Sequence, residues 1–243
     1  MKITKKLAQK AADNAHTEGV TIAFLGDSVT QGCFELYKKE GNVIETVFDK
    51  RHSYEAYVFD AFCVLYPTVT INIINAGISG DNAKSGAGRV ERDVLRHNPD
   101  LTVVCYGLND CGNEEGRLDT YLSSLSNIFD RLKSNGSEII FMTPNMMNTK
   151  ISVHLKDKDY IDIANRTASL QNDGVFDLFI DEAKKLCTEN NIPVCDCYAV
   201  WKNLYNCGVD TTELLANKIN HPTREMNKLF AYELIKTIFD CEE

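Results

Sequence analysis

The sequence predicts an α/β fold in which a central parallel sheet is covered by helices on both faces, a three-layer α/β/α sandwich. Two observations lead to this fold class. Short apolar segments alternate with helical segments along the 243 residues, and the apolar segments are hydrophobic throughout rather than at every second position. Such strands are typical of parallel sheets buried on both faces. The length suffices for a well-buried core, so we expect residues 1–243 to form a single domain.

Each expected element is a run of suitable residues bounded by a residue that ends it. The expected strands are Val20–Leu25, Val69–Ile74, Leu101–Tyr106, Glu138–Met142 and Ile192–Asp196. The expected helices are Ser53–Leu65, Gly88–Arg96, Leu118–Ser134, Val175–Asn190 and Glu225–Phe239. The first helix has aromatic and aliphatic residues at helical spacing and is closed by Pro67. The second ends before Asn98-Pro99, and Asn135-Gly136 stops the third.

The order of these elements places the carboxyl ends of the strands at one edge of the sheet, because crossovers between parallel strands are right-handed. Ligands of such open sheets bind just outside this edge. The least regular stretch of the chain, Met146–Asn172, follows a strand end and should lie over the same edge. It is either a lid or specificity loop, or a plain surface insertion.

Composition and charge exclude several classes of function. The formal net charge of −9 argues against a nucleic-acid partner and fits a neutral or weakly charged small-molecule substrate. No apolar segment is long enough to span a membrane, and the polar segment Met1–Gly19 lacks the apolar core of a secretory signal. We therefore expect a cytoplasmic protein. The nine cysteines have no regular spacing, which favours reduced, buried thiols.

The most informative segment is Phe24–Gly32. An apolar strand ends at Gly26, and Asp27 and Ser28 follow directly. This order predicts a buried strand that passes through a tight turn into a helix and presents one hydroxyl group at the ligand-binding edge. Ser28 is therefore a candidate nucleophile.

Two further strand ends carry small and polar residues. They are Asn75-Ala76-Gly77-Ile78-Ser79-Gly80 and Gly107-Leu108-Asn109-Asp110. By the topology above, both meet Ser28 at the same edge. If Ser28 attacks a carbonyl, the oxyanion can be bound by the backbone N–H groups of Ser28 and Gly77 and by the side-chain amide of Asn109. Each such donor lowers the barrier by about 3 kcal/mol.

A serine nucleophile needs a base, and histidine suits this role near neutral pH. Of the five histidines, His221 stands in Asn220-His221-Pro222-Thr223, after a region that should return to the active edge. His154, in the candidate lid, is the rival. The other three are less suitable: His16 precedes the first strand, His52 lies in a charged loop, and His97 lies at the opposite edge.

In combination these segments resemble the SGNH, or GDSL-type, hydrolase family of esterases and lipases. The four motif blocks are Gly26-Asp27-Ser28 with Gly32, then Gly77, then Gly107-Leu108-Asn109-Asp110, then His221. The resemblance covers almost the whole chain. It implies a flavodoxin-like fold, a Ser28–His221 pair, an oxyanion hole from Ser28, Gly77 and Asn109, and no metal or cofactor.

One departure from the family's pattern concerns the residue that orients the histidine. The family usually has an aspartate three residues before the histidine, and this chain has Lys218 there. A third group should hold the imidazole and steady its charged form. The candidates are Asn217, a backbone carbonyl, and the more distant acids Asp210 and Glu213. Asp27 and Asp110 are, with Asn217, possible supporting residues.

These residues predict a serine esterase that hydrolyses small acyl esters, with acetyl as the expected acyl group. Members of the resembled family often deacetylate carbohydrates, so the expected partner is a small-molecule ester such as an acetylated sugar. The aromatic residues that can stack on a sugar, or belong to the core, are Tyr37, Tyr54, Tyr160 and Trp201. The alternatives are a thioesterase or lysophospholipase on the same residues, and a non-catalytic binding protein of the same fold. A nucleotide-binding protein is disfavoured, because the first turn lacks the glycines of a phosphate loop.

Overall fold

The protein, for which a computed structural model describes residues 1–240, is organised around a five-stranded sheet in the order β4-β1-β5-β6-β7. All neighbouring strands in this sheet are parallel. The strands are β1 Val20–Gly26, β4 Ile71–Gly77, β5 Leu101–Cys105, β6 Glu138–Met142 and β7 Val194–Cys195. A separate antiparallel hairpin consists of β2 Cys33–Lys38 and β3 Ile44–Phe48.

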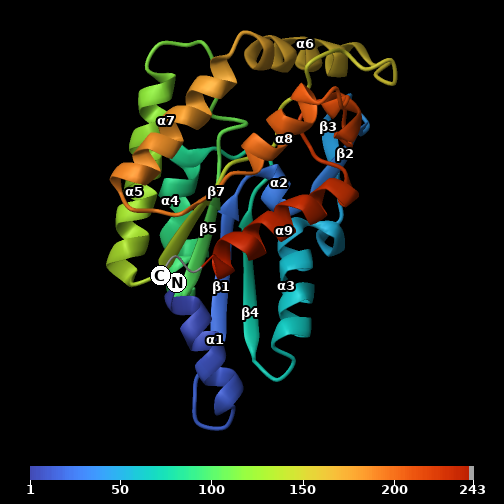
Figure 1. The fold of residues 1–243 in the computed structure, drawn as a ribbon. Helices are drawn as coiled ribbons and strands as arrows, with labels where there is room; N and C mark the ends of the chain where they lie inside the picture. Colours follow the sequence, from blue (N-terminus) through green and yellow to red (C-terminus); the bar gives the residue numbers. More distant parts are fainter. Residues whose placement is uncertain (241–243) are drawn as a thin grey trace.

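Helices cover both faces of the main sheet. The α-helices are α1 Lys2–Ala12, α2 Ser28–Gln31, α3 Tyr54–Leu65, α4 Ala83–Asp93, α5 Arg117–Asn135, α6 Lys158–Asn172, α7 Val175–Glu189, α8 Cys197–Asn206 and α9 Arg224–Phe239. The 3₁₀ helices are η1 Lys50–His52, η2 Leu95–His97 and η3 Thr211–Leu214. Figure 1 shows α4, α5 and α7 on one face of the sheet, and α3 and α9 on the other. The predicted three-layer α/β/α fold with a parallel sheet is confirmed.

The strand β1 lies at the centre of the hydrophobic core. Its segment Ile22–Leu25 is completely buried, because both faces of the strand are covered by helices. Each large apolar side chain buried in this way contributes about 1.5–3 kcal/mol. At its carboxyl end, Gly26 pairs with Gly77 of β4 and with Cys105 of β5. Three strands therefore end level with one another, and the segments that follow them meet at one place.

The helix predicted over Gly88–Arg96 was wrong at both ends, since α4 runs over Ala83–Asp93. It begins earlier because two side chains satisfy its first N–H groups. The Oδ1 atom of Asn82 accepts from the Ser85 N–H at 3.0 Å, and the Oδ1 atom of Asp110 accepts from the Ala83 N–H at 2.9 Å. Such caps allow a helix to start in a segment without an apolar repeat.

Sequence reasoning missed α1, the β2–β3 hairpin, α6 and α8. The helix α6 lies within Met146–Asn172, the stretch expected to be irregular, and its start is capped by the Asp157 side chain, which accepts from the Asp159 N–H. The hairpin did carry a signal, because Gly41 and Asn42 at its turn are residue types that tolerate the positive φ angles found there.

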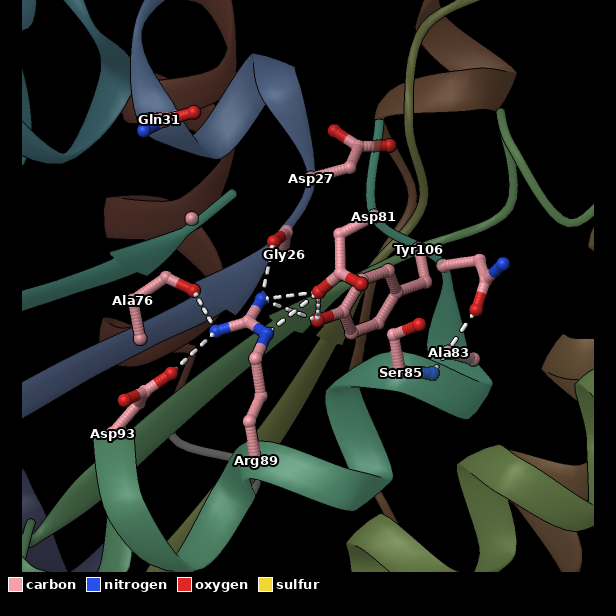
Figure 2. Close-up of polar contacts among 12 residues, drawn as sticks. Gly26, Asp27, Gln31, Ala76, Asp81, Ala83, Ser85, Arg89, Asp93 and Tyr106 are labelled. Carbon is pink, nitrogen blue, oxygen red and sulfur yellow. Dashed lines mark hydrogen bonds and ion pairs between the residues drawn. The ribbon is translucent and has the colours of Figure 1, made fainter. Parts of the chain in front are cut away.

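The buried side chain of Arg89, on α4, joins the ends of β1 and β4 (Figure 2). Its guanidinium donates to the carbonyl of Gly26 at 2.9 Å and to that of Ala76 at 2.6 Å. It also donates to the Asp81 carboxylate at 2.6 Å and to the Tyr106 hydroxyl at 2.9 Å. A buried charge is tolerated when it is paired and fully hydrogen-bonded, and Arg89 meets both conditions.

We predict that Arg89→Met lowers the free energy of unfolding by about 3–5 kcal/mol, because the substitution leaves the buried Asp81 carboxylate and two strand-end carbonyls without their donor. Arg92→Met is the matched control on the same helix, since Arg92 is largely exposed and pairs with Asp93. We expect this control to change stability by less than about 1 kcal/mol. Urea unfolding measures both, and equal effects would contradict the anchoring role of Arg89.

Candidate active site

Ser28 stands at the first position of α2, directly after β1. The Asp27 side chain caps this short helix by accepting a hydrogen bond from the Val29 N–H at 2.9 Å, and Gly32 ends it in the left-handed conformation with φ 84°. Because Ser28 lies in the first turn, its own N–H has no acceptor among residues 1–240. The turn therefore offers a hydroxyl group and an unused backbone donor on the same residue.

His221 meets Ser28 across 193 positions of the chain. Its Nε2 atom lies 2.9 Å from Ser28 Oγ, and its Nδ1 atom lies 2.9 Å from the backbone carbonyl oxygen of Phe34 on β2. A carbonyl only accepts, so Nδ1 carries the proton, and Nε2 has its lone pair toward the serine hydroxyl. Burial lowers the pKa of His221 to about 4, so the ring is neutral at neutral pH and can accept the serine proton.

The loop Leu215–Pro222 holds His221 in this position. The Oδ1 atom of Asn217 accepts from the N–H groups of Ile219, Asn220 and His221 at 3.0, 2.9 and 2.9 Å. The loop is closed by a β-bridge between Leu215 and Pro222. Asn217 thus supports the backbone of the histidine and does not contact its ring.

The residues considered as orienting acids lie elsewhere. The Glu213 carboxylate lies 2.9 Å from Lys218 Nζ and also accepts a hydrogen bond from the Ser152 hydroxyl. Asp210 forms an ion pair with Lys150. Among the alternatives left open by the sequence, the backbone carbonyl of Phe34 is the group that contacts the ring.

The rival base, His154, is exposed over 70% of its side chain, and its nearest acidic partner is Glu213 at 3.9 Å. His97 lies in a different cavity, of about 660 Å³, which runs along β4 and also contains Thr21 at the amino end of β1. This position agrees with the edge expected for His97. Of these three histidines, His221 is therefore the one within reach of Ser28.

A cavity of about 630 Å³ opens in front of Ser28 and His221 and is also lined by Asn109 and Gly80. The Nδ2 atom of Asn109 donates one hydrogen to the backbone carbonyl of Asp81 at 2.8 Å. An amide group has two such hydrogens, so the second remains for a ligand. The Asp81 contact fixes the plane of the amide beside the serine.

Gly77 does not line this cavity, contrary to the position expected for an oxyanion donor. Its N–H donates to the Asn75 side chain at 2.9 Å, so this donor is already used. A Cβ atom at Gly77 would lie 2.3 Å from the backbone nitrogen of Gln31, which explains the glycine by close packing of β4 against α2. The sequence analysis assigned the oxyanion donor to Gly77, the first glycine of Gly77-Ile78-Ser79-Gly80. In the structure it is the second glycine, Gly80, that lines the cavity.

Gly80 has φ 77° and open space where a Cβ atom would stand, and its N–H has no acceptor within the described part of the chain. The preceding residue is fixed, because the Ser79 N–H donates to Gln31 Oε1 at 2.6 Å. The signal for Gly80 in the sequence was its place at the end of a strand-end turn, three residues after Gly77.

Asp27 and Asp110, considered as supporting residues, are both buried. Burial raises the pKa of Asp27 to about 7 and that of Asp110 to about 6, and each carboxylate also feels the negative charge of Asp81. Asp110 caps α4 with Oδ1, while its buried Oδ2 has no hydrogen-bond partner among residues 1–240. Both acids act on the backbone around the site, as helix caps.

Part of the cavity lining is apolar and largely aliphatic. This apolar wall consists of Leu36, Ile44 and Phe48 from the hairpin, Ile78 after β4, Ile163 from α6 and Ile219, two residues before His221. Figure 1 shows the hairpin and α6 beyond the end of the sheet at which β1 continues into α2. The stretch Met146–Asn172 therefore lies over the active edge, as expected.

Two of the four aromatic residues considered as able to stack on a sugar are inaccessible. Tyr54 and Trp201 are completely buried in the core. The ring of Tyr160 is partly covered by the Lys38 ammonium group at 5.8 Å from its centroid. Tyr37, exposed over 42% of its surface, is the most accessible of these four.

No group of three or more His, Cys, Asp or Glu side chains within residues 1–240 is arranged to hold a metal ion. None of the helices described combines the length and the apolarity that a membrane span requires.

The sequence matches the model of the GDSL-like Lipase/Acylhydrolase family over residues 24–229. An acetylxylan esterase from Geobacillus stearothermophilus is 29% identical over 137 residues, which are 52% of this chain and 60% of that protein. An arylesterase from Vibrio mimicus is 31% identical over 72 residues, which are 30% of this chain and 36% of that protein. The match thus spans less than two thirds of the length of either relative.

Solved structures show the same fold. The crystal structure of the acetylxylan esterase from Geobacillus stearothermophilus aligns with a TM-score of 0.66 at 21% identity and covers 91% of this chain and 95% of that one. A two-domain esterase active on acetylated mannans aligns with a TM-score of 0.65 at 18% identity and covers 97% of this chain and 52% of that one.

We predict that the imidazole of His221 titrates near pH 4, because burial opposes its charged form. Histidine-labelled NMR spectra recorded between pH 8 and about pH 3.5 measure this, and His221→Gln identifies the signal. The unfolded chain binds this proton near the ordinary pKa of 6.5. The stability advantage of the wild type over His221→Gln should therefore shrink as the pH falls from 6.5 towards 4. A His221 signal that titrates at 6.5 or above would contradict the prediction.

Proposed function

Because the chain belongs to the GDSL-like lipase/acylhydrolase family, we propose that it is a serine esterase that hydrolyses small acyl esters, acetyl esters above all. The observation that carries this proposal is the 2.9 Å contact between Ser28 Oγ and the unprotonated Nε2 of His221 in a cavity. In this role Ser28 is the nucleophile and His221 the general base. The acetylxylan esterase and arylesterase relatives support an ester substrate.

In the acylation step, His221 Nε2 takes the proton of the Ser28 hydroxyl as Oγ forms a bond to the ester carbonyl carbon. The imidazolium formed keeps its Nδ1–H bond to the Phe34 carbonyl, and the negative charge of Glu35 favours its positive charge. His221 then gives the proton to the alcohol as the carbon–oxygen bond breaks. A water molecule, deprotonated by the same Nε2, then attacks the acyl carbon. The imidazolium gives this proton to Ser28 Oγ as the bond between Oγ and the acyl carbon breaks and the acid leaves.

The negative charge that develops on the carbonyl oxygen needs hydrogen-bond donors. We assign this role to the Ser28 N–H, the Asn109 side-chain amide and the Gly80 N–H, with Gly80 in place of Gly77. All three residues line the cavity, whereas the N–H of Gly77 donates to Asn75. Donors that are fixed before the reaction stabilise the charge without reorganisation, and losing one such donor typically costs about 10²–10³-fold in turnover.

We further propose that the substrate is an acetylated carbohydrate. Two proteins similar to this chain carry names that specify acetylated xylan, and a structural neighbour is active on acetylated mannans. The polar residues of the cavity that can bind sugar hydroxyl groups are Gln31, Glu45, Thr46, Asn217 and Asn220. The cytoplasmic location expected from the composition stays a prediction.

A second candidate is a thioesterase or lysophospholipase that uses the same residues. The aliphatic wall formed by the hairpin, Ile78, Ile163 and Ile219 favours it, because such a surface suits an acyl chain longer than acetyl.

We predict that Ser28→Ala abolishes hydrolysis of p-nitrophenyl acetate, because no hydroxyl remains to form the acyl-enzyme. Circular dichroism should show an unchanged fold, since the Asp27 cap of α2 does not involve the serine side chain. The wild type should also be labelled by a fluorophosphonate and the variant should not. Wild-type turnover in Ser28→Ala, or a wild type inert to the label, would reject the proposal in favour of a binding protein.

We predict that kcat/KM falls by about tenfold or more from p-nitrophenyl acetate to the butyrate and to long-chain esters, as the proposed preference for acetyl requires. Acetate release from acetylated xylo-oligosaccharides, measured with the same enzyme, tests the carbohydrate. A maximum at long chains would instead support the lysophospholipase or thioesterase candidate.

A further inference from the structure

The group that orients His221 belongs to a hairpin that is not part of the main sheet. The Phe34 carbonyl lies on β2, which pairs only with β3 among the described strands. The aspartate that the family usually has, at the position of Lys218, would lie on the same loop as the histidine. A carbonyl on a separate hairpin holds the ring only if the hairpin itself is held against the histidine loop.

Arg224, at the start of α9 and three residues after His221, makes this connection. Its Nη1 and Nη2 atoms donate to the two carboxylate oxygens of Glu35 at 2.6 and 3.1 Å. Its guanidinium carbon lies 4.3 Å from the centroid of the Phe34 ring. The side chain therefore binds both the residue whose carbonyl orients His221 and the residue that follows it.

The same guanidinium also binds the chain just after the second strand of the hairpin, at the same open end, where Cys33 pairs with Phe48. Its Nε atom donates to Asp49 Oδ2 at 2.8 Å, and Asp49 directly follows β3. The Asp49 N–H in turn donates to the carbonyl of Gly32, just before β2, at 2.8 Å. The fork of N–H groups on Arg224 thus holds the open end of the hairpin, at Glu35 on β2 and at Asp49 just after β3. With Glu35 it forms the planar two-point geometry typical of a guanidinium and a carboxylate.

Both acids are ionised when they bind Arg224. Hydrogen bonds from the guanidinium lower the pKa of Glu35 and, together with His52, the pKa of Asp49. Arg224 is partly exposed, so the ion pairs contribute little to global stability. Their effect is local, because they restrict the position of β2 relative to the loop that carries His221.

We propose that Arg224 is a positioning residue that clamps the β2–β3 hairpin through Glu35 and Asp49, so that the Phe34 carbonyl holds the proton of His221 on Nδ1. It performs at a distance the orienting task that an aspartate in place of Lys218 would perform directly. This inference rests on the proposed roles of Ser28 and His221.

The test is Arg224→Met, which keeps an unbranched apolar side chain beside Phe34 and removes the fork. We expect kcat for p-nitrophenyl acetate to fall about ten- to a hundredfold, as for a small misplacement of a catalytic group, while KM changes less than threefold. The matched control is Arg131→Met. Arg131 is similarly exposed, donates to the Ala87 carbonyl and pairs with Glu91, far from the cavity. It should keep wild-type kcat.

The second readout is the tautomer of His221 from imidazole ¹⁵N chemical shifts at neutral pH. The wild type and Arg131→Met should show the Nδ1–H form, and Arg224→Met should show a mixture with the Nε2–H form. Glu35→Gln keeps one of the two hydrogen bonds between Arg224 and residue 35, so it should give a smaller fraction of the Nε2–H form than Arg224→Met. It replaces Arg224→Met as the test if that variant does not fold.

Unchanged kcat and an unchanged tautomer in both variants would overturn the inference. This outcome is distinct from failure of the proposed function, because Ser28→Ala would still abolish hydrolysis in that case. If Ser28→Ala instead retains activity, the proposed function fails, and the tautomer measurement still decides whether Arg224 positions the ring.

Discussion

The arrangement of the site depends on the hydrogen bonds and the ion pair of the buried Arg89 guanidinium. This group binds the carbonyls of Gly26, the last residue of β1, and of Ala76, the next-to-last residue of β4, and it binds the Asp81 carboxylate. It therefore fixes the ends of two strands and the turn after the second (Figure 2). Ser28 follows the first strand, and Gly80 lies in the turn. Asn109 is linked to the same turn, because its side-chain amide donates a hydrogen bond to the backbone carbonyl of Asp81. One buried charge thus determines where the proposed nucleophile and two of the proposed oxyanion donors lie relative to one another.

His221 is held differently. The Phe34 carbonyl contacts its ring, Asn217 binds its backbone N–H, and the partly exposed ion pair of Arg224 and Glu35 lies next to Phe34. A neutral carbonyl stabilises the imidazolium less than a carboxylate does, but it fixes the tautomer equally well because it only accepts. The positive charge is favoured by Glu35, which contacts Arg224 and not the ring. In the proposed mechanism, orientation and charge stabilisation, which one aspartate combines in the usual triad, are divided between Phe34 and Glu35.

The segments outside the α/β core shape the cavity. The β2–β3 hairpin contributes both the orienting carbonyl and three apolar residues of the cavity wall, and α6 contributes Ile163. The two segments contact each other through Lys38, whose ammonium group pairs with Asp157 and Asp159 at the start of α6 at 2.8 and 2.6 Å. The apolar cavity wall and the orientation of the His221 ring therefore depend on the same hairpin.

The sequence by itself determined the parallel α/β fold and the meeting of the segments that carry Ser28 and Asn109 at one edge, because apolar strands and right-handed crossovers leave little choice of topology. It favoured His221 over His154 as the base, and the structure decided between them through the contact of His221 with Ser28. The sequence also indicated that Lys218 cannot orient the ring. Only the tertiary structure decided that the Phe34 carbonyl does so and that Gly80 rather than Gly77 reaches the cavity. A backbone carbonyl has no signature in a sequence, and two glycines three positions apart differ only in what packs against each of them.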